Sequence, residues 1–182
     1  RGRGGIGAYA VRTPRELEFF ADYVPDAVVQ AYLDGPEFTI DMLCDFSGQP
    51  LSIVPRRRDV IRAGVTDRGR TVNDPTLIEV ARTCAATLQF AGAVNIQCRV
   101  VAGQPVIFEI NPRFSGGIPL TIHAGADFPR MLVDLTAGVR VAPAIGRFRD
   151  NLWMSSYETS VFLDGTRLAL ADYHPICVED VA

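Results

Sequence analysis

The chain has 182 residues, with 18 basic and 21 acidic side chains, a net charge of −3 and 48% hydrophobic residues. These values are typical of a globular protein and exclude a disordered or collagen-like chain. No apolar run reaches the roughly 18 residues that a membrane-spanning helix needs, so we expect no membrane partner. The near-neutral charge disfavours a nucleic-acid partner, because such domains are usually basic. The sequence shows no secretory signal, and we expect a cytoplasmic protein.

The residue types narrow the chemistry further. All 18 basic residues are arginine, so a phosphate-clamping lysine cannot come from this chain. The four cysteines are scattered without a Cys-x-x-Cys pair, which predicts reduced thiols and disfavours a zinc site.

The first part of the chain begins on a glycine-rich stretch with no element before it, which indicates a piece of a larger protein. A capping box at Thr13 and Glu16, with Pro14 between them, predicts the start of a helix. Apolar runs and turn residues predict the other elements. The predicted elements up to residue 55 are a strand at Ala8–Arg12, the helix to about Asp22, a strand at Val28–Leu33, and a hairpin of Glu37–Cys44 with Pro50–Pro55.

The second part contains a polar, arginine-rich stretch, Arg56–Val72, which we predict to be a loop with short extended pieces. The elements predicted after it are a helix from Pro75 to near Gly92, two strands flanking Ala102–Gln104, a helical region at Pro119–Gly138 interrupted around Gly125–Pro129, and strand-like patches such as Trp153–Leu163. Antiparallel hairpins interleaved with helices predict an α+β fold.

The hairpin around Gly103 carries the clearest chemical signal. If Gly103 centres the turn, Gln97 lies opposite Glu109 and Asn95 lies opposite Asn111, with all four on one face. A carboxylate with carboxamides at this spacing suits Mg²⁺, although an ordinary solvated polar face would give the same pattern. The opposite face is predicted to be entirely apolar, with Val94, Ile96, Cys98, Val100, Val106, Phe108 and Ile110.

The residues after this hairpin add anion-binding groups. Arg113 follows the hairpin directly and can fork onto phosphate or carboxylate oxygens. Gly116 and Gly117 then precede a predicted helix, whose backbone N–H groups could receive an anion. Cation ligands beside anion donors are the requirements of phosphoryl transfer.

These motifs together resemble the ATP-grasp superfamily, in particular the ATP-binding domains of carbamoyl-phosphate synthase large subunits and related carboxylate–amine ligases. The resemblance implies the C-terminal lobe of an ATP-grasp domain, an antiparallel sheet backed by helices, in residues 1–141, with a C-terminal extension of unassigned role in 142–182. It further implies that Gln97, Glu109 and Asn111 bind the metal and that Arg113 contacts the transferred phosphate.

The same resemblance implies a nucleotide site. The stretch Gln30, Ala31, Tyr32 and Leu33 resembles the adenine hinge, and Glu37 the ribose contact. The opening loop with Gly4 and Gly5 resembles the glycine-rich loop that closes over the phosphates. Its literal G-x-G-x-x-G pattern does not indicate a Rossmann fold, because no strand precedes it. Arg62, with Arg58 nearby, is expected to border the phosphates as a second catalytic arginine.

The implied activity is an ATP-dependent ligase that uses Mg²⁺, with Mn²⁺ as the alternative. It would activate a small-molecule carboxylate as an acyl phosphate for attack by an amine or ammonia. Its site would need an N-terminal lobe of the same enzyme, so we expect residues 1–182 alone to be inactive. Two alternatives stay open, a nucleotide-binding module without catalytic activity and a carbamoyl-phosphate synthase subunit.

Overall fold

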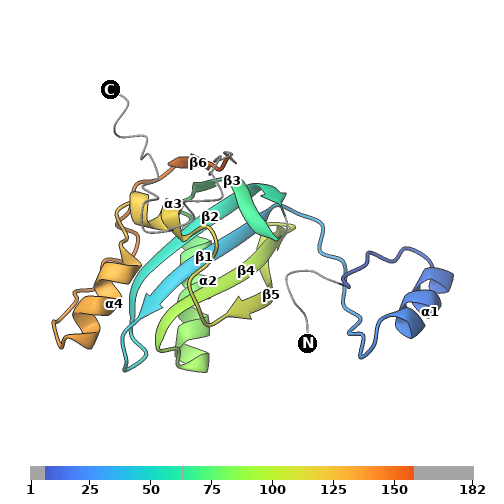
Figure 1. The fold of residues 1–182 in the computed structure, drawn as a ribbon, viewed down its shortest axis with the longest axis horizontal. Coiled ribbons are helices and arrows are strands. Elements are labelled where there is room, and N and C mark those ends of the chain that lie inside the picture. Colours follow the sequence, from blue (N-terminus) through green and yellow to red (C-terminus); the bar gives the residue numbers. More distant parts are fainter. Residues whose placement is uncertain (1–6, 63, 158–182) are drawn as a thin grey trace, which may run out of the picture.

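A six-stranded sheet forms the centre of the computed structural model, which describes residues 7–62 and 64–157 (Figure 1). The strand order is β5-β4-β1-β2-β3-β6, and every neighbouring pair is antiparallel. The strands are β1 (Glu37–Cys44), β2 (Pro50–Arg62), β3 (Val65–Thr71), β4 (Gly92–Val101), β5 (Gln104–Asn111) and β6 (Trp153–Ser155). The predicted α+β class is therefore confirmed.

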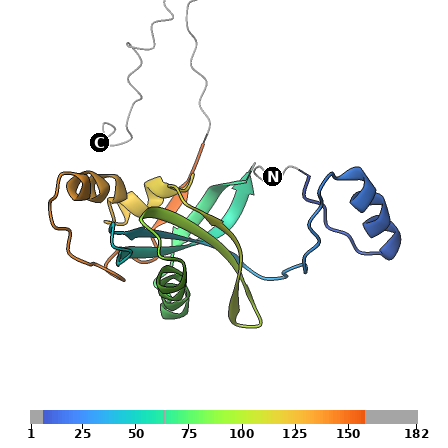
Figure 2. The same ribbon diagram turned by 90° about the horizontal axis from the view of Figure 1, so that it is seen from below.

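Helices cover both faces of this sheet. Figure 2 shows α2 (Pro75–Leu88) on one face and α3 (Ile118–His123) and α4 (Phe128–Thr136) on the other. The predicted helical region at 119–138 is confirmed with its interruption, where Gly125 adopts a φ of 100° that favours glycine. Each of the three helices carries a proline in its first turn, where the missing N–H costs nothing.

The face beneath α2 is the larger apolar core. Alternate residues of β1, namely Phe38, Ile40, Met42 and Cys44, point to this face and are buried. They pack with residues of β2, β4 and α2, which include Ile53, Ile96, Leu77 and Ala81. Each such side chain stabilises the fold by about 1.5–3 kcal/mol through removal from water.

The opposite face changes character along the strands. At one end, Leu43 and Val54 pack with Phe128 of α4 and are buried. In the middle, Asp41 and Arg56 are buried although both are charged. Beyond them the face stays polar, so one strand face passes from apolar core to polar site.

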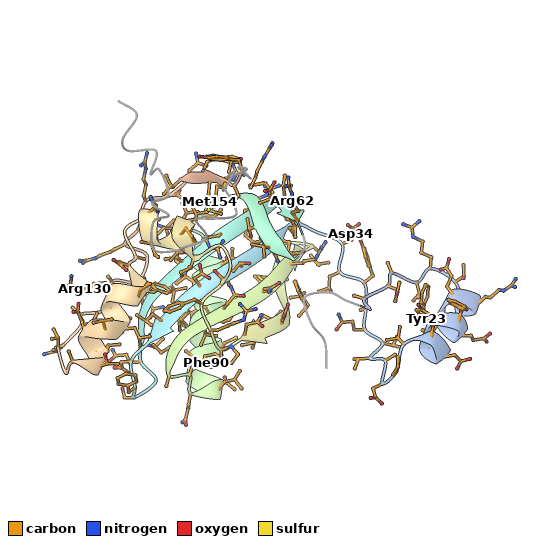
Figure 3. All side chains as sticks on the ribbon, in the orientation of Figure 1. Tyr23, Asp34, Arg62, Phe90, Arg130 and Met154 are labelled. Atoms are coloured by element: carbon orange, nitrogen blue, oxygen red, sulfur yellow. The ribbon has the colours of Figure 1, made fainter. Side chains whose placement is uncertain are left out.

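The N-terminal segment stands apart from the sheet. Helix α1 (Pro14–Tyr23) begins with the predicted capping box at Thr13, yet it buries none of its residues. Figure 3 shows Tyr23 on this helix, well away from the sheet. The aromatic side chains pack on each other instead, with Tyr9 stacked on Phe20 at a centroid distance of 4.2 Å.

Two predicted strands in this segment are wrong. Residues 8–12 and 28–33 form no strand, because no described strand lies alongside to accept their backbone hydrogen bonds. Val28 and Tyr32 are 86% and 75% exposed. Local apolar sequence alone therefore did not decide the structure here.

The predicted loop at 56–72 is also wrong. Strand β2 continues to Arg62 and pairs with β3 through residues Arg56 to Arg62, with register shifts around Val60. The arginines are compatible with strand structure because their charges find partners, as described below for Arg56 and Arg58. The many charged residues of this stretch therefore belong to strands that carry a polar site, and not to a loop.

Candidate functional site

The β4–β5 hairpin has the predicted pairs but a different turn. Asn95 lies opposite Asn111 and Gln97 opposite Glu109, as predicted. At the turn, however, Val101 pairs with Gln104, and Ala102 and Gly103 both adopt positive φ, at 48° and 78°. This is the backbone of a two-residue hairpin turn, which matches the twist of the strands.

A bulge reconciles the turn with the pairs at the open end of the hairpin. The register shifts between Gln97 and Cys98, so that Phe108 is the extra residue on β5. As a consequence, Ile107 packs against the core, whereas Val106 is 37% exposed. The predicted apolar face is therefore wrong at Val106 and is altered at Phe108.

The three predicted metal ligands share one face, and two of them already face guanidinium groups. Gln97 Oε1 accepts a hydrogen bond from Arg58 Nη1 at 3.0 Å, and Asn111 Oδ1 accepts one from Arg113 Nη2 at 3.4 Å. Glu109 is exposed and forms no ion pair within the described ranges. One carboxylate and two carboxamide oxygens are ligand types that Mg²⁺ accepts, so the side-chain chemistry fits the metal. To bind it, Gln97 and Asn111 would exchange their hydrogen bonds from Arg58 and Arg113 for the metal.

Glu37 lies between two arginines. Its Oε1 accepts from Arg58 Nη1 at 2.6 Å and its Oε2 from Arg99 Nη2 at 2.7 Å. Arg99 also donates to the backbone carbonyls of Leu33 and Gly35, at 3.4 and 3.3 Å. A continuous series of contacts therefore connects the predicted adenine and ribose residues with Gln97. Because a carboxylate offers about four acceptor sites, Glu37 keeps capacity for a further donor.

Arg58 is the central residue of this series. Besides Glu37 and Gln97, it donates from Nε to Thr66 Oγ1 at 3.2 Å and from Nη2 to the Gly64 carbonyl at 2.7 Å. Burial lowers the pKa of Arg58, and the charges of Glu37 and Glu109 oppose that shift. The guanidinium remains charged, because arginine does not lose its proton in proteins.

A buried ion pair lies next to Arg58. Arg56 Nε donates to Asp41 Oδ2 at 2.8 Å, and both side chains are almost completely buried. Asp41 also accepts from Thr121 Oγ1 at 2.5 Å and from Asn95 Nδ2 at 3.2 Å. Burial alone would raise the pKa of Asp41, but the Arg56 charge and the hydrogen bonds outweigh it, and the pKa is lowered.

The sequence analysis did not single out this pair. The available signal was an acidic residue inside the apolar stretch of β1, opposite a strand that carries three consecutive arginines. Such a residue is rarely buried without a partner. The identity of that partner depends on the pairing of β1 with β2, which the sequence did not define beyond Pro55.

A cleft opens over this polar face. Three arginines line it, namely Arg56, Arg58 and Arg113, together with Asn95, Gln97 and residues 115–117. No acidic residue in the described part of the chain lines it. The arrangement can therefore bind an anion, and with a bound cation it can neutralise a phosphate.

The remaining predicted residues lie around or outside this cleft. Arg113 donates from Nη1 to the Phe114 carbonyl at 3.0 Å. Arg62 lies at the end of β2, 3.6 Å from the Asp67 carboxylate and outside the set that lines the cleft (Figure 3). Residues 30–32 are exposed, and Gln30 lines a separate hollow beside α1. Gly4 and Gly5 fall outside the described residues.

Among the described residues, no helix is long and apolar enough to cross a membrane.

Comparison with known proteins connects this geometry to a family. The family model described as "ATP-grasp in the biosynthetic pathway with Ter operon" matches residues 23–159. The chain is 26% identical over 178 residues to the carbamoyl phosphate synthase large chain of Thermoanaerobacter pseudethanolicus, covering 86% of this chain. A second relative, from Thermomicrobium roseum, is 27% identical over 138 residues and bears the same description. The chain spans only 16% and 12% of the lengths of these relatives.

Solved structures share the fold at low sequence identity. Pyruvate carboxylase T882A of Rhizobium etli matches with a TM-score of 0.64 and 19% identity, covering 84% of this chain and 16% of that one. Biotin carboxylase of Campylobacter jejuni, solved as a β-γ-ATP complex, matches with a TM-score of 0.55 and 16% identity over 67% of this chain and 29% of that one. The family match covers most of the chain, and the chain therefore belongs to the ATP-grasp family.

Proposed function

We propose that this chain is the nucleotide- and metal-binding part of a ligase that activates a carboxylate with ATP. The product of the first step would be an acyl phosphate, which an amine or ammonia then attacks. The observation that carries the proposal is the series of contacts that runs from the Leu33 carbonyl through Arg99, Glu37 and Arg58 to Gln97. It joins the predicted nucleotide residues to the predicted metal ligands in one continuous polar face.

In this proposal each group has a defined task. Glu37 accepts hydrogen bonds from the ribose hydroxyls, and Gln97, Glu109 and Asn111 hold Mg²⁺. When bound, Mg²⁺ would neutralise phosphate charge during transfer. Arg113 orients the transferred phosphoryl group through its paired N–H donors, and Arg62 is assigned to the outer end of the same region.

The chemical steps balance without a covalent protein nucleophile. A carboxylate oxygen forms a bond to the γ-phosphorus of ATP while the bond to the β,γ-bridging oxygen breaks, and ADP leaves. The amine nitrogen then attacks the acyl carbon, phosphate leaves with the electron pair of its C–O bond, and the nitrogen loses a proton. The arginines of the cleft stabilise the negative charge that moves between these oxygens.

The test is Glu109→Ala in the complete gene product, with Glu79→Ala as a matched control. Glu79 is an exposed residue of α2, the helix on the opposite face of the sheet. We expect Glu109→Ala to abolish Mg²⁺-dependent phosphate release from ATP, and to weaken Mn²⁺ binding measured by electron paramagnetic resonance. Near-normal phosphate release would contradict the metal assignment. If the unaltered protein bound Mg²⁺-ATP but released no phosphate with any carboxylate, the module without catalytic activity would be favoured.

A further inference from the structure

We infer that the cleft holds an oxyanion, a carboxylate or a phosphate group, and that buried Arg56 is one of its hydrogen-bond donors. This inference deepens the proposed function and rests on it for the reaction in which the oxyanion takes part. None of the sequence motifs pointed to Arg56 as a ligand-binding residue.

The first observation is an unsatisfied donor. Arg56 is 1% exposed, and its Nε and Nη2 atoms donate to Asp41, with Nη2 also donating to Ser115 Oγ at 2.8 Å. Its third nitrogen, Nη1, is buried and has no hydrogen-bond partner in the described part of the chain. Buried N–H groups without partners are rare because they carry the full cost of desolvation, so this one calls for a physical reason.

The second observation is the close packing of a glycine of the cleft wall on that nitrogen. A Cβ atom at Gly117 would collide with Arg56 Nη1. The φ of Gly117 is −99°, a value that any residue adopts, so backbone conformation does not require glycine there. The glycine is needed because the backbone at this position lies too close to the Arg56 guanidinium for a Cβ atom. By contrast, a Cβ at Gly116 would meet only Val65.

The third observation is the charge of the cleft. Two of the nearby acidic groups are paired, Asp41 with Arg56 and Glu37 with Arg58 and Arg99. Glu109, opposite Gln97, is exposed and is the residue assigned to the metal. Arg113 lines the same cleft, and no acidic side chain in the described ranges does. Arg56 and Arg58 each have an acidic partner behind the cleft wall, while the cleft surface that the described residues form carries arginine donors and no carboxylate. Such a surface favours a compact oxyanion as ligand.

The chemistry allows two sources for that oxyanion, the carboxylate of the acceptor substrate or a phosphoryl group. Gln97 lines the same cleft, so either would lie next to the proposed metal. A purely structural role, in which Arg56 only fastens Ser115 to the sheet, is the competing outcome that the experiment has to separate.

The experiment follows the guanidinium ¹⁵N–H signals of Arg56 by NMR while the chain is titrated with sodium phosphate or with sodium acetate. Sodium chloride keeps the ionic strength constant. We expect a saturable shift of the Arg56 Nη signals with at least one of the two anions. Saturation with acetate alone identifies a carboxylate subsite, and saturation with phosphate alone identifies a phosphoryl subsite. Signals that do not respond to either anion would overturn the inference.

Matched variants separate binding from structure. Arg56→Lys keeps a positive charge beside Asp41 but replaces the guanidinium, and with it the Nη1 donor, by a single ammonium group. We expect it to weaken binding of the responding anion by about tenfold. Arg57→Lys is the same substitution one residue further along β2, where the side chain points to the other face. It should leave the affinity unchanged, and equal losses in both variants would overturn the inference.

Gly117→Ala provides a test that leaves every charge in place but moves the donor. Because its methyl group would collide with the Arg56 guanidinium, that group must shift, and we expect altered Arg56 signals without anion and loss of the saturable shift. Retained anion binding in this variant would count against the inference. The proposed function is tested separately by phosphate release: a protein that binds the anion at Arg56 but releases no phosphate would refute the ligase and leave the subsite standing.

Discussion

The two faces of the central sheet are made by the same strands and differ in what their alternate residues do. On the α2 side, Phe38, Ile40 and Met42 of β1 contribute to a continuous apolar core. On the other side, Asp41 belongs to the polar network, Thr39 lines the cleft and only Leu43 is apolar. Because successive side chains of a strand point to opposite faces of the sheet, one strand can contribute both to the core and to the candidate site.

The comparison also shows how differently the two faces are stabilised. The α2 face depends on apolar area, so its contribution is spread over many side chains. The polar face depends on mutual compensation, because each buried charge is favourable only while its partner is present. We therefore expect the polar face to be more sensitive to single substitutions than the apolar face.

The largest effect should come from Asp41→Ala. This change leaves the buried Arg56 charge without a partner, and we expect the free energy of unfolding to fall by about 3–5 kcal/mol. Urea denaturation measures it. A loss below about 1 kcal/mol would mean that water reaches Arg56 and that the polar face is not a dry network.

Acid should weaken the same network. The pKa of Asp41 in the folded protein is lowered below its ordinary value of 3.8. The unfolded chain therefore takes up the proton first, and the contribution of Asp41 is complete above that value and is lost as the pH falls toward the folded pKa. Thermal unfolding measured from about pH 5 to about pH 2 should show a steeper decline in the unaltered chain than in Asp41→Asn. Identical pH profiles would contradict the assignment.

A smaller effect is expected for nucleotide binding at the open end of the polar face. Glu37→Gln in the complete gene product should weaken ATP binding by about 1–3 kcal/mol, the scale of a hydrogen bond to a charged group. A 2′,3′-dideoxy analogue lacks the ribose hydroxyls and should lose far less affinity. Calorimetric titration of both nucleotides measures the difference, and equal losses would remove Glu37 from the ribose.

The smallest effect is expected on the apolar face. Ile40→Val removes one methylene from a fully buried position and should cost about 0.5–1.5 kcal/mol in the free energy of unfolding. The affinity for phosphate or acetate should not change, because Ile40 points away from the cleft. A change in anion affinity would show that the two faces are coupled through β1.

The sequence predicted the parts of the site that depend on one hairpin. The pairing of Gln97 with Glu109 is predicted correctly, although the turn lies at Ala102 and Gly103 and is not centred on Gly103. The pairing holds because the bulge at Phe108 offsets the two-residue turn. This combination could not be predicted, because neither the bulge nor the two-residue turn has a distinct sequence pattern in this hairpin.

The parts that depend on distant elements were not predicted. The Asp41–Arg56 pair requires the register of β1 with β2, and the arginines of β2 were interpreted as a loop because their partners lie far away in the sequence. Residues 28–33 show the opposite case: their sequence predicts a strand, but no neighbouring strand in the described part of the chain pairs with them. Local pattern predicts a strand reliably only where the surrounding fold supplies a partner for it.

The absence of lysine has one more consequence for the cleft. Its positive groups are Arg56, Arg58 and Arg113, and guanidinium groups neither titrate near neutral pH nor serve as targets for lysine acetylation. Lysine acetylation, which removes a positive charge in other proteins, therefore has no target among the cleft residues that this chain provides.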